Sequence, residues 1–471
     1  MLKSRLGRRL FFYRYCRDLL FLENYSLNSQ IYQVKYFISL NFLILTVGFA
    51  TAQQSGVISA DSSNTKGYIL FAPLLSKTTY LIDKAGTEVK TWKSEWLPAQ
   101  SAYLLPNGHL LRTGIDTLFN TNFPKSGGWI EEFDWNNQLI WSFLISDQKQ
   151  RRHHDICALP NGNILALVWE VKTKKEAIKA GRNPKLLGEL LWSEKIVELR
   201  PKGKNSANVV WEWHVWDHLV QDFDKSKKNF GKVEDNPQLL NINFMATVDR
   251  DWLHFNSISY DATYDQVVIS NRNLSEIFVL DHSTTTKQAA SHKGGKSGHG
   301  GDLLYRWGNT RAYDRGKVED QKLFSQHCAA WLGDSSSKII VFNNGLGRPS
   351  EEYSSVEILP THRKKNGTFG LQENKTYFPE KSSWSYTAEK RSDFYSANVS
   401  SAQVLPNGHV FICEGAKGYF FEIDANKKIV WSYLNPYSGE ASPGSGVMSN
   451  RVFKTMMYAP DYAGLKILKE K

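Results

Sequence analysis

Three histidines stand at matched positions of a repeated sequence unit, and they are the residues best suited to chemistry. His154 lies six residues before the proline of an LPNG turn, while His254 and His327 begin two comparable segments that lack this turn. The same position before the other two LPNG turns holds Gln100 and Ser400. The chain has only 12 histidines, so we expect these three to share one site. A neutral imidazole there can act as a nucleophile or as a general base.

Two arginines and two asparagines lie close to the same segments. Arg272 stands in the stretch SNRNLSEI, and Arg348 stands in FNNGLGR, whose glycines allow the chain to turn back sharply. A guanidinium group presents several N–H donors in one plane and suits tetrahedral oxyanions. Asn256 and Asn344 add neutral donors. These four residues are therefore predicted to bind an anionic substrate group.

Two chemistries fit three histidines beside an arginine. In one, a histidine is the nucleophile and its neighbours stabilise charge on a transferred group. In the other, three histidines bind a metal and leave one position open. Asp155 follows His154 and would point to the opposite face of a strand, as would His153. Without a supporting carboxylate, and with arginine nearby, we expect the nucleophilic chemistry with neither metal nor cofactor.

The elements that position these residues are hairpins. The motif LPNG occurs three times, at 105–108, 159–162 and 405–408, each time between two apolar strand-like stretches. Proline fixes φ, and Asn-Gly accepts the positive φ that a tight hairpin turn requires. A hairpin repeated along a chain indicates a repeat architecture.

A second hairpin, whose last strand contains a tryptophan, alternates with the first. Its six copies, together with the inner strand pairs, predict an all-β fold: a six-bladed β-propeller. The final segment, 450–458, is expected to pair with the first hairpin, so that both ends of the chain complete one blade. We expect the propeller to span 67–463, with a linker at 53–66 and a tail at 464–471. The six tryptophans are Trp92, Trp141, Trp211, Trp307, Trp384 and Trp431.

The N-terminal region predicts export. An apolar run at 36–49 follows Lys35 and ends in Ala-Thr-Ala, which is typical of a secretory signal peptide cleaved after Ala52. The run is short for a membrane span, so we expect a periplasmic or secreted protein. Residues 1–34 are too long for a natural signal start and are expected to be a non-native leader.

Charge and cysteine content limit the partners. The formal net charge is +11, and +6 without residues 1–52, with neither an arginine-rich stripe nor a nucleic-acid motif. Nucleic acid is therefore not an expected partner, and the oligomeric state stays open. Three cysteines remain after the signal, and an odd number excludes a complete disulfide framework. We expect Cys157, Cys328 and Cys413 to be buried apolar residues.

Two long loops carry further polar residues. The loop 282–301 contains His282, His292 and His299 among glycines. No carboxylate or cysteine accompanies the spaced histidines, so we expect a hairpin extension and not a metal site. The charged loop 223–238 is expected to be mobile and to cover one mouth of the channel.

The order of several motifs resembles the bacterial arylsulfotransferase family. HFNSI, QHCAAW and NNGLGR occur in the family's order, and the resemblance extends over about 67–463. It implies an exported six-bladed propeller that moves a sulfuryl group from an aryl sulfate to a phenol through a sulfated histidine. It also implies active-site roles for His254 and His327, and a sulfuryl-binding role for Arg348.

One position departs from the family pattern. The family's sulfated histidine lies downstream of the arginine, where this chain reads NVSSAQVLPNG, with Ser400 and Ser401. His154, His254 or His327 would then have to accept the sulfuryl group. The leading prediction is a sulfotransferase acting on an aryl sulfate donor and a phenolic acceptor. A hydrolase of sulfate esters or lactones, and a non-catalytic ligand-binding propeller, are the alternatives.

Overall fold

The computed structural model describes residues 55–119, 121–245, 250–333, 337–440 and 445–469. The expected leader and signal peptide, residues 1–52, lie outside the described residues. Within the described part, no helix combines the length and the apolar character needed to cross a membrane. The described chain is dominated by antiparallel strands, as the alternating sequence pattern predicts.

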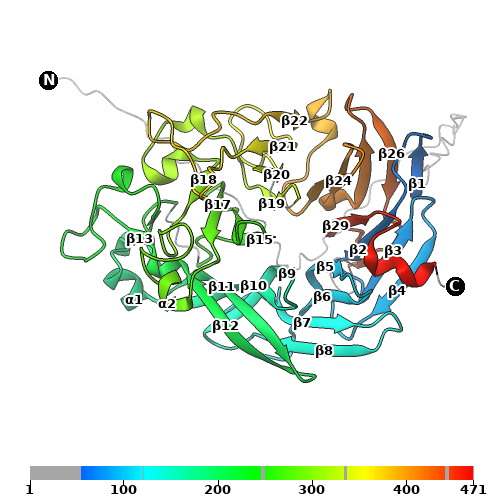
Figure 1. Cartoon of the computed structure of the whole chain (residues 1–471), viewed down its shortest axis with the longest axis horizontal. Helices are drawn as coiled ribbons and strands as arrows, with labels where there is room; N and C mark the ends of the chain where they lie inside the picture. Colours follow the sequence, from blue (N-terminus) through cyan, green and yellow to red (C-terminus); the bar gives the residue numbers. More distant parts are fainter. Residues whose placement is uncertain (1–54, 120, 246–249, 334–336, 441–444, 470–471) are drawn as a thin grey trace, which may run out of the picture. The chain divides into compact units, whose positions relative to one another are not determined.

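Six sheets follow one another in chain order around a central axis (Figure 1). Each has four strands in simple succession, and the first strand of each lies nearest the axis. This arrangement is the predicted six-bladed β-propeller. From the axis outward, the first three sheets are β29–β2–β3–β4 (Val452–Tyr458, Tyr68–Pro73, Thr78–Asp83, Glu88–Lys93), β5–β6–β7–β8 (Pro98–Leu104, Leu110–Ile115, Gly128–Phe133, Leu139–Leu144) and β9–β10–β11–β12 (Gln150–Ala158, Ile164–Thr173, Leu190–Lys202, Ser206–His214).

The other three sheets repeat the same order. The last of them carries a fifth strand at its outer edge, β1 (Gly56–Ala60), which pairs antiparallel with β26. Part of the expected linker 53–66 is therefore a strand. These sheets are β15–β16–β17–β18 (Phe255–Asp261, Gln266–Asn271, Glu276–Asp281, Tyr305–Trp307), β19–β20–β21–β22 (His327–Trp331, Lys338–Asn343, Ser355–Pro360, Trp384–Tyr386) and β23–β24–β25–β26 (Ser401–Val404, Val410–Glu414, Tyr419–Ile423, Ile429–Leu434).

Both ends of the chain complete one blade, as predicted. Strand β29 pairs antiparallel with β2 in a register that places Tyr68 opposite Tyr458. The strand nearest the axis thus comes from the C-terminal end and the three outer strands from the N-terminal end. This pairing closes the ring.

The repeated tryptophans connect neighbouring blades. Five of them donate their indole N–H to a group in the next blade: Trp92 to Asp134 O, Trp141 to Ser206 O, Trp211 to Thr284 Oγ1, Trp307 to Pro379 O and Trp431 to Lys84 O. The sixth, Trp384, lies under the ammonium group of Lys427 in the next blade. Because Trp431 reaches from the last blade to the first, the series of contacts runs around the whole ring.

The connections of the third, fourth and sixth blades contain short helices and strands. Helix α1 (Lys174–Lys179) and helix α2 (Thr286–Ala289) lie in connections of the third and fourth blades. Strands β13 (Leu219–Val220) and β14 (Leu240–Asn241) pair in parallel and flank the charged loop 223–238. Strands β27 (Gly439–Glu440) and β28 (Met448–Ser449) form a small pair before β29.

The cysteines are not disulfide-bonded within the described residues. Cys328 and Cys413 are buried, and Cys157 is half-buried. Burial raises the pKa of the Cys157 and Cys328 thiols to about 12. The burial of Cys328 and Cys413 agrees with the prediction, whereas Cys157 is less buried than expected.

Candidate active site

A left-handed residue recurs near the start of the inner strands. In four of the blades the register of the inner strand is interrupted at or beside this residue, as in a β-bulge, and in the last blade the residue directly precedes β23. The bulge redirects the side chains next to it, which strict strand alternation would have sent to opposite faces. The residues and their φ angles are Gln100 (100°), His154 (48°), His254 (58°), Cys328 (52°) and Ser400 (87°).

The bulge at His154 overturns the expectation that only one residue of the His153–His154 pair faces inward. Both rings are buried, and their Nδ1 atoms lie 2.8 Å apart. The Nε2 atom of His153 lies 2.8 Å from Oε2 of Glu194, which is also buried. The ring of Trp169 stacks on His153 with centroids 4.0 Å apart and fixes its plane. A hydrogen-bonded chain thus runs from Glu194 through His153 to His154.

Burial keeps this chain neutral. It lowers the pKa of His153 and of His154 well below the ordinary value, with a further decrease from the charge of His254. It also raises the pKa of Glu194 well above the ordinary value, and the charge of Asp251 adds to this. A carboxylic acid hydrogen-bonded to two neutral imidazoles can supply a proton at the far end of the chain, and the negative charge then resides on the carboxylate.

His254 is arranged as a nucleophile or base. Its Nδ1 atom is hydrogen-bonded to Oδ2 of Asp251, three residues earlier. Its ring lies 4.5 Å from that of His154, centroid to centroid. Among the described residues, the Nε2 atom of His254 has no hydrogen-bond partner, and its side chain is 22% exposed. An imidazole that donates Nδ1–H to a carboxylate presents an electron pair on Nε2.

His327 is held at both nitrogens. Its Nδ1 atom lies 2.8 Å from Oδ1 of Asn344 and 3.2 Å from the carbonyl oxygen of Ser325. Its Nε2 atom accepts a hydrogen bond of 3.3 Å from the backbone N–H of Val399. Burial, reinforced by the charge of Arg272, lowers the pKa of His327 to about 3. His327 is therefore a neutral ring whose one free nitrogen electron pair, on Nε2, already accepts a hydrogen bond.

The four residues predicted to bind an anion have different surroundings. The guanidinium of Arg272 is close enough to His327 to affect its pKa, and its backbone N–H donates to His254 O. Arg348 donates to Tyr353 O and Ser355 Oγ. Within the described chain, it hydrogen-bonds to none of the three histidines. The side-chain N–H groups of Asn344 bond to Ser396 O and Val399 O, and Asn256 Nδ2 donates to Gln326 O, 2.8 Å away.

The low pKa of His327 predicts a pH-dependent stability. The unfolded chain binds a proton on this ring below about pH 6.5, whereas the folded chain stays neutral down to a pKa of about 3. Stability is therefore lost as the pH falls through this window. Between pH 7 and pH 5, urea denaturation of the wild type should lose about 2 kcal/mol more than that of His327→Gln. The exposed control His299→Gln should follow the wild type; equal losses for His327→Gln and the wild type would contradict the assignment.

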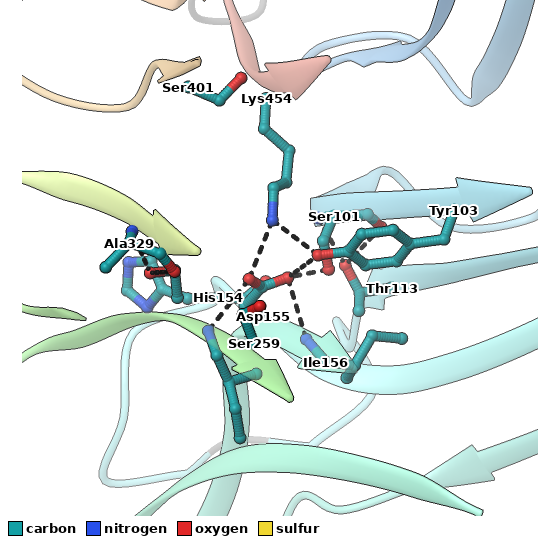
Figure 2. Close-up of polar contacts among 12 residues, drawn as sticks. Ser101, Tyr103, Thr113, His154, Asp155, Ile156, Ser259, Ala329, Ser401 and Lys454 are labelled. Atoms are coloured by element: carbon teal, nitrogen blue, oxygen red, sulfur yellow. Dashed lines mark hydrogen bonds and ion pairs between the residues drawn. The ribbon is translucent and has the colours of Figure 1, made fainter. Parts of the chain in front are cut away.

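A cavity of about 910 Å³ opens at the other end of the inner strands. It is lined by residues of all three LPNG turns, by Cys157 and Cys328, and by Lys454. None of the three histidines lines it. A network lies beside it (Figure 2), in which the Lys454 ammonium is 2.9 Å from Asp155 Oδ2 and 2.6 Å from Tyr103 Oη. Asp155 thus faces this network and not the histidines, as the strand alternation predicts.

Ser400, which stands at the repeat position that His154 occupies in the third blade, is fully buried. Its hydroxyl group lies 2.9 Å from Ser396 Oγ and accepts a hydrogen bond from Gly415 N–H, also 2.9 Å long. These contacts hold the loop before β23.

Three of the residues that build the site were not predicted from the sequence. Asp251 had a usable signal, because Asp-x-x-His places a carboxylate within reach of an imidazole when the chain turns. His153 was not included because adjacent residues of a regular strand face opposite sides, and the bulge at His154 changes this alternation. Glu194 gave no local signal: it lies opposite Trp169 on the neighbouring strand, and its Oε1 atom also accepts the N–H of Phe255 beside His254.

Comparison with known proteins gives the family. The model of the arylsulfotransferase (ASST) family matches residues 56–446. The chain belongs to this family. An arylsulfate sulfotransferase AssT from Lelliottia amnigena is 28% identical over 166 residues, which cover 32% of this chain and 25% of that protein. The arylsulfate sulfotransferase AssT of Escherichia coli O6:H1 strain CFT073 is 25% identical over 182 residues, covering 37% and 29%.

The matched parts span less than a third of these two arylsulfotransferases. Among solved structures, a Bacteroides caccae protein of unknown function has a TM-score of 0.45 at 12% identity and covers 83% of this chain and 99% of its own. A periplasmic gluconolactonase from Pseudomonas aeruginosa has a TM-score of 0.40 at 11% identity, with coverages of 84% and 99%. Scores this low carry no argument about the function of this arylsulfotransferase-family chain.

Proposed function

We propose that this protein transfers a sulfuryl group from an aryl sulfate to a phenolic acceptor, and that His254 carries the group between them. The observation behind this assignment is the Asp251–His254 pair beside His154 in a member of the arylsulfotransferase family. Asp251 orients the ring and stabilises the positive charge that develops on it. The relatives named above are arylsulfate sulfotransferases, which favours this class of donor.

In the first step, Nε2 of His254 attacks the sulfur atom of the donor. The N–S bond forms as the bond between sulfur and the aryl oxygen breaks, and the electron pair of that bond leaves with the oxygen. His154, with a proton on Nε2, protonates the leaving oxygen to give a free phenol. The proton is replaced along the chain, from Glu194 to His153 and from His153 to His154. Glu194 then holds the negative charge.

In the second step, the direction of the proton transfer reverses. His154 accepts the proton of the acceptor phenol on Nε2, and the chain returns a proton to Glu194. The phenol oxygen attacks sulfur, the N–S bond breaks, and His254 recovers its electron pair. The raised pKa of Glu194 supports this role, because a carboxyl group that readily regains its proton can drive deprotonation of the phenol.

The charge of the sulfuryl oxygens requires a cation. We assign this contact to Arg272, whose guanidinium lies near His327 and whose backbone is hydrogen-bonded to His254. Arg348 would join it as a second cation after exchanging its hydrogen bonds with Ser355 and Tyr353 for the sulfuryl oxygens. Asn344 and His327 position the site. The buried Oδ1 atom of Asn256, which has no hydrogen-bond partner among the residues that the structure describes, can accept a hydrogen bond from the acceptor hydroxyl.

The proposed setting is the periplasm or the exterior of the cell. The signal-like run before Ala52 supports it. An aryl sulfate is itself an activated donor, so the reaction would need no nucleotide.

Incubation of the purified protein with 4-nitrophenyl sulfate and phenol tests the proposal. The expected result is release of 4-nitrophenol that depends on phenol, together with phenyl sulfate. In the absence of acceptor, mass spectrometry of the peptide containing His254 should show a gain of about 80 Da, the mass of a sulfo group. Release that does not need phenol would indicate a hydrolase, and a thermal shift without turnover would indicate a binding protein; either result overturns the proposal.

A further inference from the structure

A second cluster of histidines and a carboxylate lies on the third and fourth blades, apart from the three-histidine site. It joins His218, between η2 (Val215–Asp217) and β13, with His292 and Asp302 from the long connection before β18. Their ligand atoms all lie within 4.8 Å of one another. From this geometry we propose that His218, His292 and Asp302 form a binding site for a divalent transition-metal ion such as Zn²⁺.

The hydrogen-bond geometry of His218 supports the proposal. Its Nε2 atom lies 2.8 Å from the carbonyl oxygen of Ala289, and a carbonyl can only accept, so the proton of a neutral His218 is on Nε2. The Nδ1 atom then bears an electron pair, and it lies 2.8 Å from Oδ1 of Asp302. Two electron pairs facing each other at this distance repel, unless a proton or a metal ion lies between them.

His292 strengthens the case, because its Nδ1 atom lies 2.7 Å from the same oxygen of Asp302. Three donor atoms from separate parts of the chain therefore converge on one point. Imidazole nitrogen and carboxylate oxygen are ordinary zinc ligands, with bonds of about 2.0–2.2 Å. Tetrahedral ligands on one zinc ion stand about 3.3 Å apart at such bond lengths. Opening the two short contacts by about half an ångström would admit the ion.

The surroundings of the buried histidine match those of a metal ligand. A ligating histidine usually donates its other N–H to a carbonyl or carboxylate, as His218 does to Ala289. The ring of Trp213 stacks on His218 at 5.6 Å with an interplanar angle of 5°, and its indole N–H donates to Gly301 O. A Cβ atom on Gly301 would stand 2.0 Å from Ala289 O and 2.6 Å from His218 Nε2, so only glycine permits this approach.

An ion can reach the cluster from a neighbouring cavity. His292 is 59% exposed, whereas His218 and Asp302 are 0% and 7% exposed. His292 also lines a cavity of about 630 Å³, together with Trp216 and residues 226–231 of the charged loop. Three lysines also line this cavity, and their positive charge repels an approaching metal ion. Once the metal ion is bound, the same charge favours an anion as its remaining ligand. The three lysines are Lys179, Lys227 and Lys228.

The sequence suggested no metal in this region because the histidines of loop 282–301 lack a carboxylate within the loop. The structure supplies Asp302 at the end of the loop and His218 from about eighty residues upstream. Of the three histidines in that loop, only His292 belongs to the cluster. His282 lies between Asp265 and Glu198, which together raise its pKa to about 9 against the effect of burial.

Cobalt titration tests the proposal on the full chain. After treatment with a chelator and dialysis, the wild type should bind one Co²⁺ with visible absorption bands of tetrahedral cobalt, and Zn²⁺ should displace it. His292→Ala and Asp302→Asn should each weaken zinc binding by about 100-fold or more, since loss of a ligand exceeds the 10–100-fold cost of losing a supporting residue. Zinc should also raise the Tm of the wild type but not of these variants.

The control His299→Ala removes an exposed histidine of the same loop that is not part of the cluster. It should bind zinc like the wild type. The buried His218 is left unchanged, so that loss of binding cannot be confused with misfolding. Failure to observe saturable binding of either metal would overturn the proposal, as would binding that His292→Ala and Asp302→Asn leave intact. The cluster would then be a protonated His218 paired with Asp302.

Discussion

Replacing His254 with glutamine is expected to reduce kcat/KM for transfer from 4-nitrophenyl sulfate to phenol by about 10³-fold or more, because the amide cannot form the N–S bond. Glutamine keeps most of the volume of the ring and can still hydrogen-bond to Asp251. Initial rates with saturating phenol measure the loss. The 80 Da gain on the peptide that contains residue 254 should disappear at the same time.

Asp251→Asn tests the contribution of the carboxylate that orients the His254 ring, while the nucleophile itself is retained. It keeps the shape of the side chain but removes the charge that stabilises the ring, and a loss of about 10²–10⁴-fold is expected. His299→Gln, on an exposed loop, should retain wild-type activity. If His254→Gln keeps more than a tenth of the activity while its Tm is unchanged, then His254 is not the residue that carries the sulfuryl group.

The fold could be predicted because its local signals repeat. Each LPNG turn determines a hairpin by backbone sterics alone, and each tryptophan-ended hairpin marks the outer half of a blade. The closure of the ring could be predicted as well, since the first hairpin lacked an inner strand and the last segment lacked a partner. The contacts that the tryptophans make between blades could not be predicted, because five of the indole N–H groups bond to residues 42 or more positions away, as from Trp92 to Asp134.

The site could be predicted only in part. Matched positions in the repeat identified His154, His254 and His327, and the structure places the ring of His154 beside that of His254. The partners that give each ring its protonation state come from other strands, as Glu194 does, or depend on a bulge, as His153 does. Strand alternation cannot reveal a bulge, because one left-handed residue reverses the facing of every residue after it.

The same limitation applies to the His218 cluster. Its carboxylate and its exposed imidazole come from the connection before β18, whereas its buried imidazole comes from a segment about eighty residues upstream. A sequence pattern shows only neighbours along the chain, whereas a metal site requires neighbours in space. Glycine-rich spacing in loop 282–301 is visible in the sequence, but its reason appears only in the structure, where Gly300 and Gly301 approach the carbonyl oxygens of Ser291 and Ala289.

Arg306→Ala is expected to lower the free energy of unfolding by about 3–5 kcal/mol, because it leaves a buried carboxylate without its partner. Arg306 and Glu276 pair across neighbouring strands with side chains that are 0% exposed. The guanidinium also donates to the carbonyls of Pro237 and Leu239, and it lies 4.4 Å from the ring of Tyr313. It therefore ties the excursion between β12 and β15 to the fourth blade. Urea denaturation followed by tryptophan fluorescence measures the loss.

Two controls show whether the loss of stability comes from breaking the buried Arg306–Glu276 pair or from removing an arginine in general. Arg391→Ala removes an arginine whose side chain is 50% exposed, 3.6 Å from Glu351, and it should cost less than about 1 kcal/mol. The double variant Arg306→Met with Glu276→Met removes both charges and should recover part of the loss, since two apolar side chains of similar volume leave neither charge unpaired. If Arg306→Ala is as mild as Arg391→Ala, the buried pair does not hold the excursion to the blade. If the double variant is no more stable than Arg306→Ala, the cost comes from the carbonyl contacts of the guanidinium and not from the uncompensated Glu276.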